Sequence, residues 1–220
     1  MTAEIRDIAV FTTVAALIAT ALMLVPGTAL AWVLARRRFP GKAVVETLVS
    51  LPLVMPPVAT GLLLLWLFSR RGPLGSLLDA VGIEVVFTPV AVVIAMAIMG
   101  LPLLVRTARA GFEQVTRRYE QIAETLGAGP WRVFATVSLP LASRNILAGA
   151  VLGFSRALGE FGATIVVAGS IPGQTRTLAV GIYTFTETGQ EAQAVTLLVI
   201  SVTIAFAAVL ISNWLARDAH

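Results

Sequence analysis

Residues 119–140 read YEQIAETLGAGPWRVFATVSLP, a polar stretch with glycines and a proline at its centre. Apolar side chains recur there at helical spacing, first before Gly127 and again after Pro130. Gly127 is placed where a helix C-terminus takes a left-handed residue, and Pro130 fits the first position of a second helix. The stretch therefore predicts two short helices that meet at a tight turn, the second of them stopped by the SLP at 138–140.

The chain around this stretch is strongly apolar. Of its 220 residues, 57% are hydrophobic and 13% are charged, whereas a soluble domain usually has about 25% charged residues. It has no cysteine, which excludes disulfides and thiolate metal sites. We expect one all-α, polytopic transmembrane bundle over residues 1–220, with about five spans, or six if the first run divides at Pro26. The five predicted spans are 9–35, 45–69, 87–106, 142–168 and 194–215.

Basic residues in the connections indicate the orientation, because cytoplasmic loops carry an excess of lysine and arginine. They are interpreted as orientation signals and not as nucleic-acid contacts. One set of loops holds eleven and the opposite set holds four, which places the N-terminus outside and the C-terminus, with segment 118–140, in the cytoplasm. The first set is Arg36, Arg37, Arg38, Lys42, Arg106, Arg109, Arg117, Arg118, Arg132, Arg144 and Arg217, and the second is Arg6, Arg70, Arg71 and Arg176.

Two interpretations of the polar segment compete. An anchor on the membrane surface would carry lysine or arginine along its polar face. Here the polar face of the first helix has Glu120 and Glu124, and the second helix has Arg132 alone. An acidic face directed away from an anionic leaflet suits a protein partner better, while packing beneath the bundle stays open.

The string EQIAETLG at 120–127, followed by LP at 139–140, resembles the EAA motif of binding-protein-dependent ABC-transporter permeases. Ile122 departs from the commonest form, which has alanine there. In that family the motif forms coupling helices that sit in a groove on a cytoplasmic ATPase subunit. The resemblance assigns ATPase docking to Glu120, Ala123, Leu126, Gly127, Trp131 and Phe134.

The chain lacks an ATPase site of its own. A phosphate-binding loop needs Gly-Lys followed by serine or threonine. The only lysine is Lys42, and Ala43 stands where the magnesium-binding hydroxyl belongs. We therefore expect no enzyme activity and no cofactor in this chain, with ATP and Mg²⁺ bound by a partner subunit.

Arg156 and Glu160 lie in the middle of an apolar run, four residues apart and so on one helix face. Ionised groups at membrane depth are costly and usually face a bundle interior or an aqueous path. The two residues form either a structural ion pair that pins neighbouring helices, or part of the permeation route, with Arg156 attracting an anion.

The second span contains LPLVMPPVATG at 51–61, and its prolines interrupt the helix. Broken backbone at membrane depth is tolerated where protein or a water-filled cavity satisfies the freed carbonyls. The break is either a simple kink or a border of the central route.

The segments 51–61 and 156–178 also look like signatures of the molybdate-transporting members of this permease family, and the similarity extends from about residue 31 to 216. Permeases for sulfate, thiosulfate and tungstate are close relatives and remain alternatives. The translocation pathway or its gate is expected at Pro56, Pro57, Arg156, Glu160, Phe161 and Thr164.

The resemblance implies a homodimer in a bacterial or archaeal inner membrane, with two cytoplasmic ABC ATPase subunits docked beneath it. A periplasmic or extracellular binding protein would deliver a tetrahedral oxyanion. The rival from another class is an ATP-independent channel or secondary carrier, which would use Arg156 and Glu160 for selectivity or proton coupling and residues 119–139 as a surface anchor.

Overall fold

The computed structural model describes residues 3–217, with side chains to residue 214, and every regular element in this part of the chain is helical. This confirms the all-α prediction. Four helical stretches are long and apolar enough to cross a bilayer, and a bent pair of helices, α2 and α3, brings the number to five if it makes one span. The four are α1 (Ala3–Arg36), α5 (Pro89–Gln114), the stretch Pro130–Leu158 that ends in α8 (Leu139–Leu158), and α11 (Glu191–Arg217).

Helix α1 is continuous, so the alternative of six spans is wrong. Its 34 residues would extend about 51 Å at 1.5 Å per residue, beyond a hydrocarbon core of about 30 Å. Pro26 lies inside the helix without ending it. A Cβ on Gly27 would come within 2.7 Å of Leu104, so the glycine allows α5 to approach closely. We infer that packing against α5 holds α1 together past the proline.

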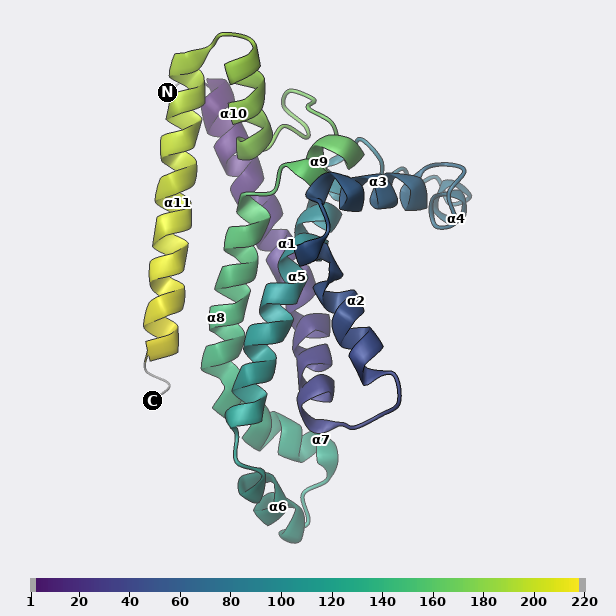
Figure 1. The fold of residues 1–220 in the computed structure, drawn as a ribbon, viewed down its shortest axis with the longest axis vertical. Coiled ribbons are helices and arrows are strands. Elements are labelled where there is room, and N and C mark those ends of the chain that lie inside the picture. The colour runs from purple at the N-terminus through teal and green to yellow at the C-terminus, as the bar shows by residue number, and fades with distance from the viewer. Residues whose placement is uncertain (1–2, 218–220) are drawn as a thin grey trace.

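The core lies where α5 packs between α1 and α8 (Figure 1). Met96, Met99 and Leu104 of α5 are fully buried there. Helix α11 covers one side of α8 and packs against α10 (Leu178–Glu187), while much of its own surface is exposed and apolar. In a membrane bundle such a surface suits contact with lipid. The segment 169–193, predicted not to span, thus contains a short helix that packs on the bundle.

The predicted fourth span is wrong at its start. A continuous helical stretch begins at Pro130, runs through a π-helical turn η1 (Phe134–Ser138) and continues as α8. The SLP sequence therefore does not stop the helix. In the wide turn the amide of Leu139 donates to the carbonyl of Phe134, and Pro140 falls in the first turn of α8. Proline has no N–H to donate, and the wider turn accommodates its ring without breaking the helix.

The same predicted span is also wrong at its end, because α8 stops at Leu158 and a separate short helix α9 (Gly162–Val167) follows. Helices α2 (Lys42–Val54) and α3 (Pro57–Phe68) meet at an angle of 113°. Helix α3 packs on α9, and α4 (Gly75–Asp79) follows it. Two broken segments therefore lie against each other.

The two ends of the bundle differ in what they carry. The start of α1 lies at the end with α10, whereas α6 (Arg117–Thr125), α7 (Pro130–Val133) and the last turns of α11 lie towards the other (Figure 1). The polar segment 118–140 therefore forms one tip of the molecule, on the side opposite the start of α1.

Candidate functional site

The tip has the predicted pair of short helices, α6 and α7, joined by a tight turn. Gly127 has φ +86°, the left-handed conformation expected of it. The amide of Ala128 donates to the carbonyl of Ala123, and the amide of Gly127 to that of Glu124, which closes the end of α6. A Cβ at position 127 would meet nothing within 4 Å, so glycine is required there for its backbone conformation and not for space.

An exposed apolar face covers this tip, formed by Tyr119, Ile122, Leu126 and Trp131. Leu126 is 83% exposed and Trp131 is 81% exposed. Large apolar side chains grouped on a polar segment at the end of a molecule mark an interaction surface. Of the residues predicted to dock, Leu126 and Trp131 thus point outward, and Ala123 is half-buried.

Glu120 points inward, away from this face. Its Oε1 accepts a hydrogen bond of 2.9 Å from Nε of Arg36 and one of 2.6 Å from Oγ of Ser138. Arg36 also donates to the carbonyl of Val115. These contacts connect the start of α6 to the end of α1 and to η1. We call Arg36, Glu120 and Ser138 the inner polar cluster.

Phe134 also points inward. Its ring centroid lies 5.2 Å from that of Trp32 in α1, 6.2 Å from Phe112 in α5 and 6.4 Å from the outward Trp131. An aromatic chain therefore leads from the exposed apolar face into the bundle. The sequence placed Glu120 and Phe134 among docking residues, and the structure shows that both also contact the rest of the chain. A docking role stays a prediction for all six residues.

The predicted pair of charges forms, although the helix that should carry both residues ends between them. Nη1 of Arg156 donates to Oε2 of Glu160 over 2.7 Å, and Oε1 of Glu160 accepts from the amide of Ala163 over 2.7 Å. The side chain of Glu160 is 1% exposed. The carboxylate thus joins the end of α8 to the first turn of α9. Either role, as a structural pair or as part of a gate, stays a prediction.

The remaining predicted pathway residues surround this junction. Thr164 is fully buried, and its hydroxyl donates to the carbonyls of Glu160 and Phe161. The ring of Phe161 lies 5.2 Å from that of Tyr183. Pro56 and Pro57 stand exposed at the bend between α2 and α3. Their part in translocation stays a prediction, and in this conformation neither Glu160 nor Thr164 lies on an open surface.

The start of α3 packs tightly against α9. A Cβ on Gly162 would come within 2.7 Å of Pro57, and one on Gly61 within 2.8 Å of the backbone of Ala163. The broken second span and the broken end of the fourth are therefore in direct contact, which no spacing in either segment had indicated.

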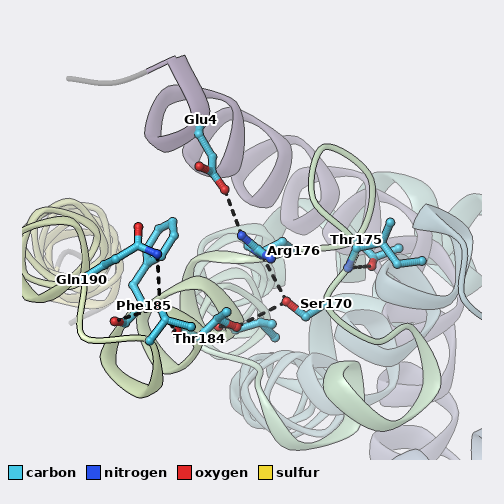
Figure 2. A network of polar contacts seen from close by, with 10 residues as sticks. Glu4, Ser170, Thr175, Arg176, Thr184, Phe185 and Gln190 are labelled. Atoms are coloured by element: carbon cyan, nitrogen blue, oxygen red, sulfur yellow. Dashed lines mark hydrogen bonds and ion pairs between the residues drawn. The ribbon is translucent and has the colours of Figure 1, made fainter.

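A second polar network lies at the opposite end of the molecule (Figure 2). Nη1 of Arg176 donates to Glu4 over 2.9 Å, and its Nε donates to Oγ of Ser170 over 3.1 Å, so that this loop is tied to the N-terminal turn of α1. The guanidinium also lies over the ring of Phe185 in α10. The sequence had identified Arg176 only as a loop arginine, and a partner 172 residues away leaves no local signal.

Arg70, which counts against the predicted orientation, is paired within its own connection. It hydrogen-bonds Glu84 and lies 3.9 Å from Asp79. The hydrogen bond and the charge of Glu84 raise the pKa of Arg70 above its ordinary value. Its charge is balanced by neighbouring carboxylates, so it weighs less as an orientation signal than an unpaired arginine would.

No group of three or more histidine, aspartate or glutamate side chains within residues 3–214 is arranged to hold a metal ion.

Comparison with solved structures finds the same fold in ABC transporters. The chain superposes on a bacterial alginate ABC transporter, in complex with an alginate pentasaccharide-bound periplasmic protein, with a TM-score of 0.74 and 16% identity, over 99% of this chain and 80% of that one. It superposes on an inward-facing MetNI methionine ABC transporter with a TM-score of 0.67 and 16% identity, over 99% of this chain and 94% of that one.

Comparison of sequences finds nearer relatives. The chain is 49% identical over 193 residues to the molybdenum transport system permease protein ModB of Escherichia coli K12, covering 87% of this chain and 84% of that one. It is 42% identical to ModB of Haemophilus influenzae, over 85% and 82% of the two chains. The family model for the binding-protein-dependent transport system inner membrane component matches residues 27–219. The chain therefore belongs to the family of binding-protein-dependent transport system inner membrane components.

Proposed function

We propose that this chain is the permease subunit of an ATP-driven importer whose cargo is molybdate. The observation that carries this proposal is the exposed apolar face on a turn of coupling-helix geometry, in a chain 49% identical to a molybdenum permease. Exposure of the apolar side chains of Leu126 and Trp131 to water would be unfavourable in an isolated bundle. A groove on a cytoplasmic ATPase would cover both side chains, and that subunit would bind ATP and Mg²⁺.

The described contacts could transmit movement of the ATPase to the helices of the bundle. The exposed apolar face receives the movement of the partner. The inner polar cluster connects α6 to α1 and η1, and the ring of Phe134 packs against Trp32 and Phe112. Because η1 continues without a break into α8, displacement of the tip would tilt α8 as a rigid body, as alternating access requires.

The assembly we propose contains two copies of this chain and two ATPase subunits, in a bacterial or archaeal inner membrane. Helix α2 has no buried residue, so its surface is available to a second copy. The N-terminus and the loop tied by Arg176 would face outside, where a binding protein delivers the anion. The tip and the C-terminus would face the cytoplasm.

Sulfate is the second candidate cargo, because a specific relative supports it. The sulfate transport system permease protein CysT of Escherichia coli K12 is 41% identical over 157 residues, which are 71% of this chain and 57% of that one. Sulfate and molybdate are both tetrahedral dianions. The relatives named for molybdenum match over a larger share of this chain, which favours molybdate.

Reconstitution in vesicles tests the proposal. Vesicles containing this chain and its ATPase should take up molybdate when ATP and a molybdate-loaded binding protein are supplied, and uptake should stop when any of these is withheld. Uptake driven by an ion gradient alone would refute the proposal in favour of a secondary carrier. An excess of sulfate that abolishes molybdate uptake would reassign the cargo.

Docking is tested separately by a double variant, Leu126→Asp with Trp131→Asp. It should lose co-purification of the ATPase while its helical content stays unchanged. Gln121→Asp places one such negative charge on the other side of α6 and should retain the ATPase. Equal retention by both proteins would contradict the docking role of the exposed apolar face.

A further inference from the structure

A cavity of about 510 Å³ lies between α2 and α5, on the half of the bundle that carries the tip. Its walls are apolar except for a few side chains: Glu46, Thr47 and Ser50 from α2, and Arg106 and Arg109 from α5. Polar groups are thus gathered on one side of an otherwise apolar space. Such a combination is typical of a binding site for a small ligand.

The charges along this cavity do not cancel. Nη1 of Arg109 donates to Glu46 over 2.7 Å and its Nε donates to Glu113 over 2.7 Å, while Nζ of Lys42 lies 3.8 Å from Glu46. These four groups balance one another. Arg106 donates to Oγ of Ser50 over 3.0 Å, and among the described residues it has no carboxylate within ion-pair distance. The cavity therefore keeps the positive charge of one arginine next to a hydroxyl.

Arg106 differs in this respect from the other arginine considered for the route. The charge of Arg156 is already matched by the buried carboxylate of Glu160. Arg106 is exposed, and the hydroxyl of Ser50 that accepts from it still has its own hydrogen to donate. A guanidinium offers several N–H groups in a planar fork that suits oxyanions. Arg106 and Ser50 together thus provide donors directed at one position.

The position of the pair also fits an exit from the bundle. Arg106 is eight residues before the end of α5 at Gln114, or about 12 Å along the axis, and α5 leads directly into α6 at the tip. Ser50 lies in α2 before the bend of 113°. An anion held by both residues would lie between the bend and the coupling helices.

We propose that Arg106 and Ser50 form a binding site for a tetrahedral oxyanion on the cytoplasmic side of the bundle. This rests on the proposed function and adds to it a place where the cargo is held before release. The free N–H groups of Arg106 and the hydroxyl of Ser50 donate to the oxygens of the anion. Because the other described charges of the cavity balance one another, a single unpaired arginine holds the anion, which keeps binding weak, as conduction requires.

Cysteine labelling tests this site, since the chain has no cysteine of its own. Thr47→Cys places one thiol in the cavity, on an exposed position of α2. In the purified complex with its ATPase, in nanodiscs of neutral phosphatidylcholine, molybdate should slow labelling by a methanethiosulfonate reagent. Thr186→Cys is the matched control. It is an exposed helical threonine at the opposite end, with the same hydroxyl bond to the carbonyl four residues earlier.

Replacement of Arg106 shows whether its charge is responsible. In the Thr47→Cys background, Arg106→Gln should abolish protection by molybdate. It should also shift the ratio of labelling rates about fivefold from an anionic reagent towards a cationic one, because one nearby charge is removed. Arg106→Lys keeps the charge without the planar fork and should restore the rate ratio but only part of the protection. Protection that persists unchanged in Arg106→Gln would overturn the proposal.

The other outcomes are equally decisive. If molybdate fails to protect Thr47→Cys when Arg106 is present, the site does not exist. If anionic phosphatidylglycerol protects the thiol and molybdate does not, the phosphate of a lipid headgroup occupies the cavity and the proposal is wrong. Native complex that takes up molybdate with ATP but shows no protection refutes only this site. Complex that shows protection but no ATP-dependent uptake refutes the proposed function.

Discussion

Replacing Glu120 with glutamine separates two roles for the start of the coupling segment. In the structure this carboxylate contacts its own chain, through Arg36 and Ser138, and not the outward surface. If the inner polar cluster holds α6 in place, Glu120→Gln should loosen α6 before any partner is added. If Glu120 contacts the ATPase instead, the isolated permease should be unaffected.

The size of the effect follows from the geometry. The side chains of Arg36 and Glu120 are 10% and 15% exposed, so water screens the pair only partly. Hydrogen bonds to charged groups contribute about 1.5–3 kcal/mol each. Glutamine keeps an acceptor for Ser138 but removes the charge that faces Arg36. We expect the free energy of local opening of α6 to fall by about 2 kcal/mol.

Hydrogen–deuterium exchange of the isolated permease measures this opening. A fall of about 2 kcal/mol corresponds to amide exchange roughly 30-fold faster in residues 117–125. Glu124→Gln is the control, because it makes the same chemical change on an exposed position of the same helix. If Glu120→Gln and Glu124→Gln exchange at the same rate as the native chain, the inner polar cluster does not hold α6. Loss of ATPase binding with unchanged exchange would restore Glu120 to the docking surface.

Three further substitutions give distinct outcomes. Gly127→Val should abolish ATP-coupled uptake without changing the thermal unfolding midpoint, because a β-branched residue resists φ +86° although space is available. Unchanged uptake would show that this backbone conformation is not needed for coupling. Glu160→Gln should destabilise the purified complex by about 3 kcal/mol, since it leaves Arg156 without its buried partner; altered transport at full thermal stability would instead identify a gate. Gly61→Val should lower the free energy of unfolding by about 1–3 kcal/mol, because its Cβ meets the backbone of Ala163 at 2.8 Å. The control Val58→Ile, at an exposed position of the same helix, should leave the unfolding midpoint unchanged.

The sequence predicted features that depend on neighbouring residues. Apolar runs longer than a bilayer core identify spans without any knowledge of their packing. The turn at Gly127 follows from glycine and proline chemistry over a few residues, and the structure confirms it. The pairing of Arg156 with Glu160 follows from a spacing of four and also forms, although α8 ends before the second residue.

Features that depend on distant residues could not be predicted in this way. The sequence places Glu120 on an outward polar face, because no neighbouring residue indicates that its partner is Arg36, 84 residues away. The predicted stop at Pro140 was wrong for a local reason, because the π-helical turn directly before it accommodates the proline ring. The sequence identifies Arg106 only as a cytoplasmic arginine, because its partner Ser50 lies 56 residues away on α2.

The sequence by itself determined that this chain is a helical membrane protein with a coupling-type turn, since length, hydropathy and local backbone preferences act over one or two helical turns. The tertiary structure decided which of the described charged side chains have an oppositely charged partner and which have none, because that depends on which helices lie side by side. Arg36 and Arg106 are the same type of residue, but Arg36 is a structural contact and Arg106 is an exposed donor. They differ because a carboxylate from another helix lies beside Arg36 and none among the described residues pairs with Arg106.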